Sequence, residues 1–193
     1  MTRIGVPEIT VTGDDVTWSV PVSGFEDSPD RLWFTLPARY ADMVTPLADP
    51  ALIGLLVPAM RVGAPLVVEG PVTDELVQSH RQEIQHIQHT VVGGLSRVPI
   101  ETCSAVRAGR PANGVATGFS AGVDSFTVLA EHHFADIPKD LRVTHLTHFN
   151  LGSHGEGERG RALFRARLAR LIPVADELGL PLIPVDSNMD EFF

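Results

Sequence analysis

The chain has 193 residues, of which 44% are hydrophobic and 20% are charged, and its formal net charge is −9 at pH 7. This composition is typical of a globular protein with a buried core, and the acidic balance argues against broad nucleic-acid binding, which needs a basic surface. Its single cysteine, Cys103, excludes an intrachain disulfide, and no Cys/His quartet could hold a structural zinc. No apolar run approaches the ~20 residues of a membrane span, so we expect a cytoplasmic protein without membrane contact.

The N-terminal half of the chain begins with strand patterns. Alternating apolar and polar residues on both sides of a Gly-Asp-Asp turn predict a β-hairpin over residues 9–22, and residues 32–36 predict a third strand. Residues 49–60 predict a short buried helix that begins with Asp49 as its N-cap. Pro58 is expected to end or kink this helix, because proline cannot donate a backbone hydrogen bond.

The next elements complete a first domain. Residues 65–70 predict a strand, residues 71–92 a longer helix and residues 98–102 another strand. The expected apolar stripe of the longer helix consists of Leu76, Ile84, Ile87 and Val91. The Gly- and Pro-containing stretch 108–114 predicts a domain boundary. We therefore expect residues 1–110 to form a small α+β domain, whose role the sequence does not assign.

Three histidines lie on the longer helix. His86 and His89 are three residues apart and share a face, whereas His80 points in a different direction. No carboxylate completes a metal-ligand set, so we favour a polar, solvated helix face over a metal site.

The second half of the chain alternates strand and helix. The expected elements are strands at 115–119, 143–150 and 181–186 and helices at 124–134 and 158–178. This order predicts a parallel sheet with helices on both faces, in a Rossmann-like α/β domain spanning residues 111–193. Ligands of such sheets bind beyond the carboxyl ends of the strands.

A loop of small and polar residues, Ser120–Ser125, follows the first of these strands and precedes a helix. The first N–H groups of a helix lack partners within it, so this loop is suited to bind an anion such as phosphate. Ala121 and Gly122 allow close backbone approach, and the two serine hydroxyls can donate hydrogen bonds. Asp124 would repel an anion, and we interpret it as a ligand of the Mg²⁺ that accompanies a nucleotide.

The loop reads Ser-Ala-Gly-Val-Asp-Ser and resembles the S-G-G-x-D-S pyrophosphate loop of the PP-loop ATP pyrophosphatases. That superfamily includes asparagine synthetase, 7-cyano-7-deazaguanine synthase and tRNA-thiolation enzymes. Ala121 stands where glycine is usual, and we expect ordinary backbone angles there. The loop is neither a Walker A motif nor a G-x-G-x-x-G fingerprint.

The resemblance implies an enzyme that binds ATP and Mg²⁺. Ser120, Gly122 and Ser125 would bind pyrophosphate together with backbone N–H groups from Ala121–Val123, and Asp124 would hold the metal. Ser120 and Asp124 are the implied catalytic residues. The implied reaction is adenylation: a substrate oxygen attacks the α-phosphorus, pyrophosphate leaves, and a nucleophile then displaces AMP.

The second step has several candidates. An amide- or nitrile-forming ligase acting on a small-molecule or nucleobase substrate, with ammonia or an amine as nucleophile, is favoured. ATP-dependent sulfur transfer to a nucleobase or tRNA is the alternative, although Cys103 is the only cysteine. A nucleotide-binding regulatory protein without catalysis, or a scaffold with a decayed loop, represents other classes. In each case we expect a homo-oligomer.

Other polar residues follow the second and third strands. Asn150 resembles an adenosine contact, or is a turn-forming residue, and Asp186 either helps to hold Mg²⁺ or caps a helix. The Gly-rich stretch 152–160 is either a lid or an exposed loop. Within it, His154 is a candidate acid–base group or phosphate contact.

Five arginines cluster on the second helix of this domain: Arg159, Arg161, Arg165, Arg167 and Arg170. We favour a solvated face, with a docking site for an anionic substrate as the alternative. Only three strands are predicted where the PP-loop resemblance implies five. We therefore expect a partner chain, or a further segment of a longer protein, to complete the sheet.

Overall fold

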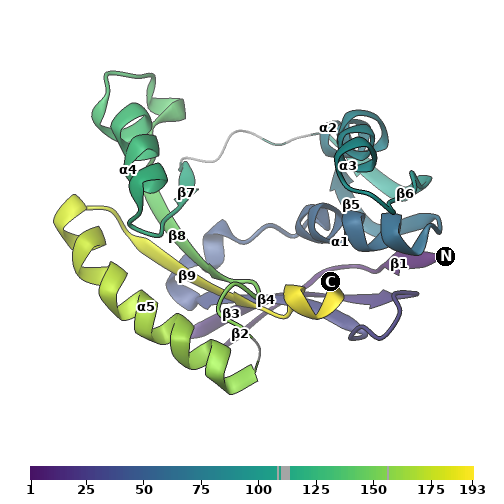
Figure 1. The fold of residues 1–193 in the computed structure, drawn as a ribbon, viewed down its shortest axis with the longest axis horizontal. Coiled ribbons are helices and arrows are strands. Elements are labelled where there is room, and N and C mark those ends of the chain that lie inside the picture. Colours follow the sequence, from purple (N-terminus) through teal and green to yellow (C-terminus); the bar gives the residue numbers. More distant parts are fainter. Residues whose placement is uncertain (108, 110–113, 156) are drawn as a thin grey trace. The chain divides into compact units, whose positions relative to one another are not determined.

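The computed structural model describes residues 1–107, 109, 114–155 and 157–193 (Figure 1). The chain divides into two compact units: unit 1 comprises Met1–Gly109 with Asn188–Phe193, and unit 2 comprises Arg110–Ser187. The last six residues therefore pack with unit 1, although the sequence places them in the second domain. Most of the predicted linker 108–114 lies outside the described residues.

Unit 1 is built on a mixed sheet. Its strands are β1 (Thr2–Ile4), β2 (Glu8–Thr12), β3 (Asp15–Ser23), β4 (Arg31–Pro37), β5 (Leu66–Thr73) and β6 (Ile100–Val106). β1, β5 and β6 are parallel neighbours, whereas β3 is antiparallel to β1, β2 and β4. The predicted hairpin is confirmed as β2 and β3, which turn at Gly13 with φ +59°.

Helix α1 (Asp49–Val62) supplies much of the core of unit 1. Its N-cap is Ala48 rather than Asp49, whose carboxylate instead accepts a hydrogen bond from the Thr73 N–H at 2.8 Å. Pro58 lies inside α1 without ending it, and the helix stops at Gly63, which adopts φ +69°. The largest buried side chains of α1 are Leu52, Leu55, Leu56 and Met60.

The second helical stretch of unit 1 consists of α2 (Asp74–Ser79), a π-helical turn (His80–Ile84) and α3 (Gln85–Val91). It starts later than predicted because residues 71–73 continue β5 and pair with β6. The π turn closes i→i+5 hydrogen bonds and so rotates the face that follows it. As a result Ile87 and Val91 are exposed, and Gln85 is buried instead.

Unit 2 is a β–α–β–α–β unit, as predicted. Its elements are β7 (Ala116–Gly118), α4 (Val123–Leu129), a π-helical turn (Ala130–Phe134), a short 3₁₀ helix (Lys139–Leu141), β8 (His145–Asn150), α5 (Gly157–Leu178) and β9 (Leu182–Ser187). The three strands are parallel, with β8 in the centre.

Both helices of unit 2 pack on the same face of its strands, whereas the sequence pattern suggests helices on both faces. Leu129 of α4 and Leu171 and Ala175 of α5 join Leu146 of β8 in one buried cluster. Three strands in sequential order bring both connections to one side, because each crossover has the same hand. Within the described part of the chain, no helix is both long and apolar enough to cross a membrane.

Candidate functional site

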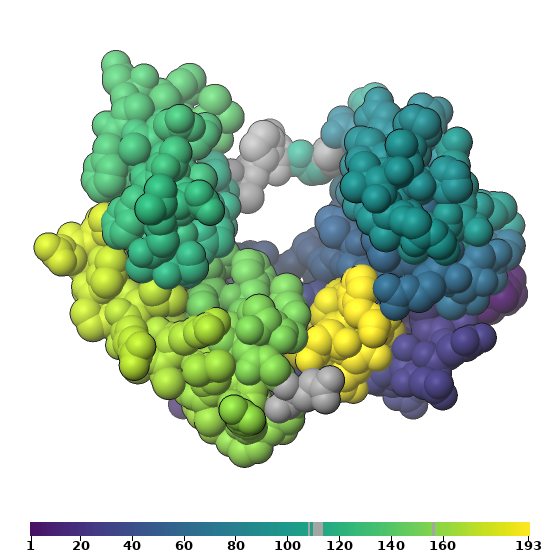
Figure 2. Space-filling model, in the orientation of Figure 1, coloured from purple at the N-terminus to yellow at the C-terminus, as the bar shows by residue number. Residues whose placement is uncertain are grey.

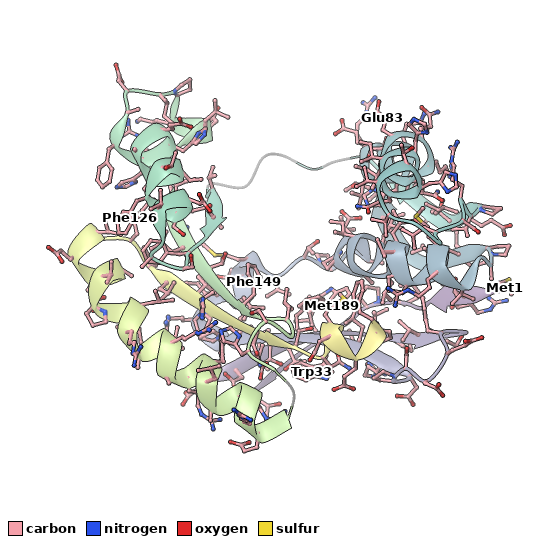
Figure 3. All side chains as sticks on the ribbon, in the orientation of Figure 1. Met1, Trp33, Glu83, Phe126, Phe149 and Met189 are labelled. Carbon is pink, nitrogen blue, oxygen red and sulfur yellow. The ribbon has the colours of Figure 1, made fainter. Side chains whose placement is uncertain are left out.

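The loop between β7 and α4 leaves the sheet beside the middle of β8. Phe119 donates its N–H to the Thr147 carbonyl at 2.8 Å and buries its side chain, and Phe126 of α4 packs edge-on against it at 5.9 Å (Figure 3). Gly122 is the N-cap of α4 and makes no side-chain capping bond. The predicted strand–loop–helix arrangement is therefore present, and the N–H groups at the start of α4 face the loop.

Ala121 adopts the left-handed conformation, with φ +56°. The expectation of ordinary backbone angles at this position is therefore wrong. Alanine in this region costs roughly 1–2 kcal/mol relative to a right-handed conformation, and glycine avoids that cost. The chain thus keeps a backbone shape suited to glycine at the one position where the motif departs from the PP-loop pattern.

The two serines of the loop are hydrogen-bonded to each other. The Ser120 N–H donates to Ser125 Oγ at 3.1 Å, and the two hydroxyl oxygens lie 3.2 Å apart. Ser125 is buried, whereas Ser120 is exposed. Ser125 therefore shapes the loop from inside, and Ser120 can present its hydroxyl to a ligand.

Asp124, in the first turn of α4, is exposed. Its carboxylate has no hydrogen bond or ion pair to any of the described residues, so both oxygens are available to a cation. The described residues contain no group of three or more His, Cys, Asp or Glu side chains that could hold a metal ion.

A cavity of about 450 Å³ adjoins the loop. Its lining comes from three elements of unit 2: Ser120 and Ala121 of the loop, His148 of β8, and Arg167, Arg170 and Leu171 of α5. The charged residues of this lining are two arginines, although the net charge of the chain is −9. Convergence of three elements on one concave surface is typical of ligand sites in α/β proteins.

Sequence reasoning missed His148 as a site residue. The register pairs Gly118 of β7 with Thr147 of β8, so His148 is the next residue of β8 where the loop leaves β7. Asn150, which the sequence favours, lies two residues further along β8. Only the strand register distinguishes the two positions, and the sequence does not contain it.

The ring of His148 lies in a buried aromatic cluster with His154 and Phe164. His148 stacks on Phe164 with centroids 5.2 Å apart and planes 3° apart, and the His154 centroid lies 5.3 Å from that of His148. His148 Nδ1 donates to the Phe119 carbonyl at 3.3 Å. The Nε2 atoms of both histidines are buried without a hydrogen-bond partner in the described structure.

Burial lowers the pKa of both histidines below the usual 6.5, and the charge of Arg167 lowers it further. The hydrogen bond from His148 to Phe119 acts in the opposite direction but is the smaller effect. Both rings are therefore neutral at pH 7. His148 carries its proton on Nδ1 and presents Nε2 as an acceptor.

Asn150 and Asp186 are register partners at the ends of β8 and β9. Asn150 Nδ2 donates to Asp186 Oδ1 at 2.7 Å, and the same oxygen accepts the Ser187 N–H at 3.0 Å. The two residues are therefore brought together as predicted by the strand-end rule. Their hydrogen bond, however, occupies groups that the sequence assigns to a nucleotide or a metal.

The Gly-rich stretch 152–160 is held against α5 in its described part. Gly160 lies in the first turn of α5, where a Cβ atom would meet the Gly155 carbonyl oxygen at 1.9 Å. His154 is only 6% exposed and contacts Phe164. The described part of this stretch thus packs against α5.

The arginines of α5 divide into two groups. Arg161 and Arg165 bond to Glu158, whose pKa is lowered by these two hydrogen bonds. Arg167 and Arg170 line the cavity instead. All five arginines, Arg159 included, are exposed, as the prediction of a solvated face requires. Arg167 and Arg170 in addition line the cavity, so the alternative of an anion-docking site stays open for these two.

The three histidines of unit 1 do not form a cluster. His80 is buried and donates from Nδ1 to the Leu76 carbonyl at 2.9 Å, and His89 donates from Nδ1 to the Leu95 carbonyl at 2.6 Å. His86 is exposed. Burial lowers the pKa of His80. These contacts are structural.

No protein-family model, curated protein or solved structure matches the chain. The loop, the cavity and the residues that line it are therefore the features of the chain that bear on its function.

Proposed function

We propose that unit 2 binds ATP at the Ser120–Ser125 loop and uses it to adenylate a substrate oxygen, with release of pyrophosphate. The observation that supports this proposal is the combination of the loop with the adjoining cavity. A left-handed Ala121, a buried Ser125 and the N-terminus of α4 give the loop a shape suited to phosphate, and the cavity beside it is lined by two arginines.

Each loop residue has a role in this proposal. Backbone N–H groups of Ala121–Val123 and the Ser120 hydroxyl donate to phosphate oxygens, while Ser125 fixes the loop through the Ser120 N–H. These donors are in place before the ligand arrives, so little reorganisation is needed.

Asp124 fits a magnesium site of the kind that nucleotides bring with them. Mg²⁺ is commonly held by one or two carboxylates together with phosphate oxygens and waters, and Asp124 is exposed without a partner among the described residues. The absence of a larger ligand cluster in the described chain is compatible with such a site. Bound Mg²⁺ supplies charge neutralisation on the phosphates. Asp186 fits less well, because one of its oxygens already accepts two hydrogen bonds.

The proposed reaction needs no nucleophile from the protein. A substrate oxygen forms a bond to the α-phosphorus, the bond between that phosphorus and its bridging oxygen to the β-phosphate breaks, and pyrophosphate leaves. The donors of the loop stabilise the charge that develops on the leaving group. Ammonia or an amine then displaces AMP from the activated substrate, which corresponds to an amide- or nitrile-forming ligase.

Calorimetric titration of the 193-residue chain with MgATP tests the nucleotide site. We expect binding that falls at least about tenfold in Asp124→Asn and on removal of magnesium, because a lost charge contact of about 1.4 kcal/mol corresponds to that factor. Asp140→Asn is the matched control, since Asp140 is an exposed aspartate of unit 2 remote from the loop in sequence. Equal binding by both variants would remove the proposed role of Asp124.

Product analysis separates an enzyme from a regulatory nucleotide-binding protein. We expect ³¹P NMR to detect AMP and pyrophosphate when MgATP is incubated with the chain, ammonia and a panel of carboxylates and nucleobases. Nucleotide binding with no turnover on any acceptor would favour the regulatory alternative.

A further inference from the structure

The two arginines of the cavity differ from the other cations of α5 in their position on the helix. At 3.6 residues per turn, Arg167 and Arg170 lie about 40° and 100° to one side of the buried Leu171, whereas Arg161 and Arg165 lie about 80° and 120° to the other side. Figure 2 shows atoms of α5, coloured yellow-green, at the surface. The buried stripe thus separates the two pairs of arginines.

The two pairs also differ in their partners. Arg161 and Arg165 both contact Glu158, at 3.4 and 2.5 Å, so that their charge is partly compensated. Among the described residues, no carboxylate lines the cavity beside Arg167 and Arg170. Two guanidinium groups one helical turn apart attract an anion, and each can bind it through two parallel hydrogen bonds.

The hydrogen-bond donors that line the cavity come from two of its sides. The loop contributes Ser120 and the backbone at Ala121, and α5 contributes the two guanidinium groups. A ligand with two linked anionic centres can place one centre at each side. A volume of about 450 Å³ lies within the range of roughly 300–1,000 Å³ that small-molecule sites occupy, so a ligand with two linked anionic centres fits.

We propose that Arg167 and Arg170 hold the pyrophosphate end of the ligand, so that a diphosphate bridges the Ser120–Ser125 loop and α5. This inference rests on the proposed function, because it specifies how the ATP site holds the β- and γ-phosphates and the leaving group. It also assigns a role to the two arginines that neither the loop motif nor the comparisons provide.

Titration with inorganic pyrophosphate and with orthophosphate, in the presence of Mg²⁺, tests the inference. We expect pyrophosphate to bind at least about tenfold more tightly than orthophosphate, since only the former reaches both sides. Arg167→Gln and Arg170→Gln should each weaken pyrophosphate binding about 10- to 100-fold, the range for hydrogen bonds to charged groups.

Arg161→Gln and Arg165→Gln are the matched controls, because they remove the same charge from the same helix on its other side. We expect less than about a twofold change in these variants. Arg167→Lys, which keeps the charge but loses the bidentate fork, should be intermediate. Circular dichroism verifies that each variant keeps the α/β fold.

Three results would overturn the inference. They are no binding of pyrophosphate, binding no tighter than that of orthophosphate, and equal binding of pyrophosphate by the Arg167, Arg170 and control variants. If ATP binding depends on magnesium and Asp124 but is unchanged in the Arg167 and Arg170 variants, the inference is overturned and the proposed function stands. If pyrophosphate binding depends on the arginines but ATP does not bind, the inference stands and the proposed function is overturned.

Discussion

A cavity on the second helical stretch of unit 1 differs from the cavity of unit 2 in what lines it. This unit 1 cavity, about 590 Å³, is lined by Asp74, Glu75, Gln78, Ser79, Gln82 and Glu83, which all belong to the stretch from α2 to the π turn. The cavity of unit 2 is smaller, at about 450 Å³, but three elements line it and its charges are two arginines. A groove along one helix is an ordinary surface feature. Convergence of a loop, a strand and a helix indicates a site.

The charges sharpen this contrast. Three carboxylates line the cavity of unit 1 and repel anions, in keeping with the acidic chain as a whole. The charged residues that line the cavity of unit 2 are positive instead. An anionic ligand should therefore distinguish the two units, and the predictions below test whether it does.

The largest expected effect comes from reversing charge in the two cavities. We expect Arg167→Glu to weaken pyrophosphate binding more than about 100-fold, because it replaces an attraction by a repulsion. Glu83→Lys should leave the affinity unchanged within about twofold, since the unit 1 cavity lacks the loop donors. Calorimetry measures both. A comparable gain of pyrophosphate binding in Glu83→Lys would show that charge alone defines the site.

Gly160→Ala should destabilise unit 2 strongly. The added methyl group would lie 1.9 Å from the Gly155 carbonyl oxygen, and overpacking of this kind typically costs about 1–3 kcal/mol. Gly93→Ala, where no atom lies within 4 Å, is the control in unit 1. Urea unfolding compares the two. A stable Gly160→Ala variant would mean that residues 153–155 are not held against α5.

Ser125→Ala should cost about 0.5–1.5 kcal/mol of stability, because it removes the buried hydroxyl that accepts the hydrogen bond of the Ser120 N–H. Ser79→Ala is the matched change in the other cavity, where the hydroxyl donates to the Leu76 carbonyl at a half-buried site. We expect a smaller loss there. Equal losses in chemical denaturation would contradict the role of Ser125 in shaping the loop.

The stability of the folded chain should decrease as the pH is lowered, because His148 and His154 are neutral in the folded state. Because the pKa of His148 is lowered in the folded state, the unfolded chain binds more protons below 6.5. The stability contribution is thus complete above 6.5 and is lost as pH falls through the folded pKa. His148→Gln should flatten this slope, and NMR titration of the ring should give the pKa directly. A His148 that titrates at or above 6.5 would contradict the buried cluster.

The smallest effect is expected at Ala121. Ala121→Gly should stabilise unit 2 by about 1 kcal/mol, since it removes the strain of φ +56°. Ala135→Gly, at a residue with φ −67°, should instead lose stability. Thermal unfolding measures both changes. If Ala121→Gly lowers the stability of unit 2, Ala121 does not adopt the left-handed conformation.

The strands and helices of unit 2 could be predicted because their patterns are regular and their turns are marked by glycine, serine and asparagine. The helix of unit 1 after β5 was less predictable. Its π turn shifts the buried face from Ile87 to Gln85, and no residue pattern announces an extra residue in a helical turn. Gln85 compensates for its burial through two hydrogen bonds to the backbone of Val98, at 3.1 and 2.7 Å.

The loop of the candidate site was predictable from its motif, but its neighbours were not. His148 joins the cavity through strand register, and Arg167 and Arg170 join it through the rotation of α5 relative to the sheet. Both are tertiary facts. Conversely, the hydrogen bond between Asn150 and Asp186 follows from neighbouring strand ends, although the sequence alone offers a ligand contact or a local turn or cap for each residue.

The packing of the last six residues has a consequence for the order in which the units are completed during synthesis. Asn188 bonds to the backbone of Arg31 and Trp33, and the Met189 side chain fills the space above Gly54. Residues 188–193 follow unit 2 along the chain, so they are synthesised after the whole of unit 2, which is one continuous segment. The segment that carries the candidate site can therefore fold before unit 1 acquires the packing of residues 188–193.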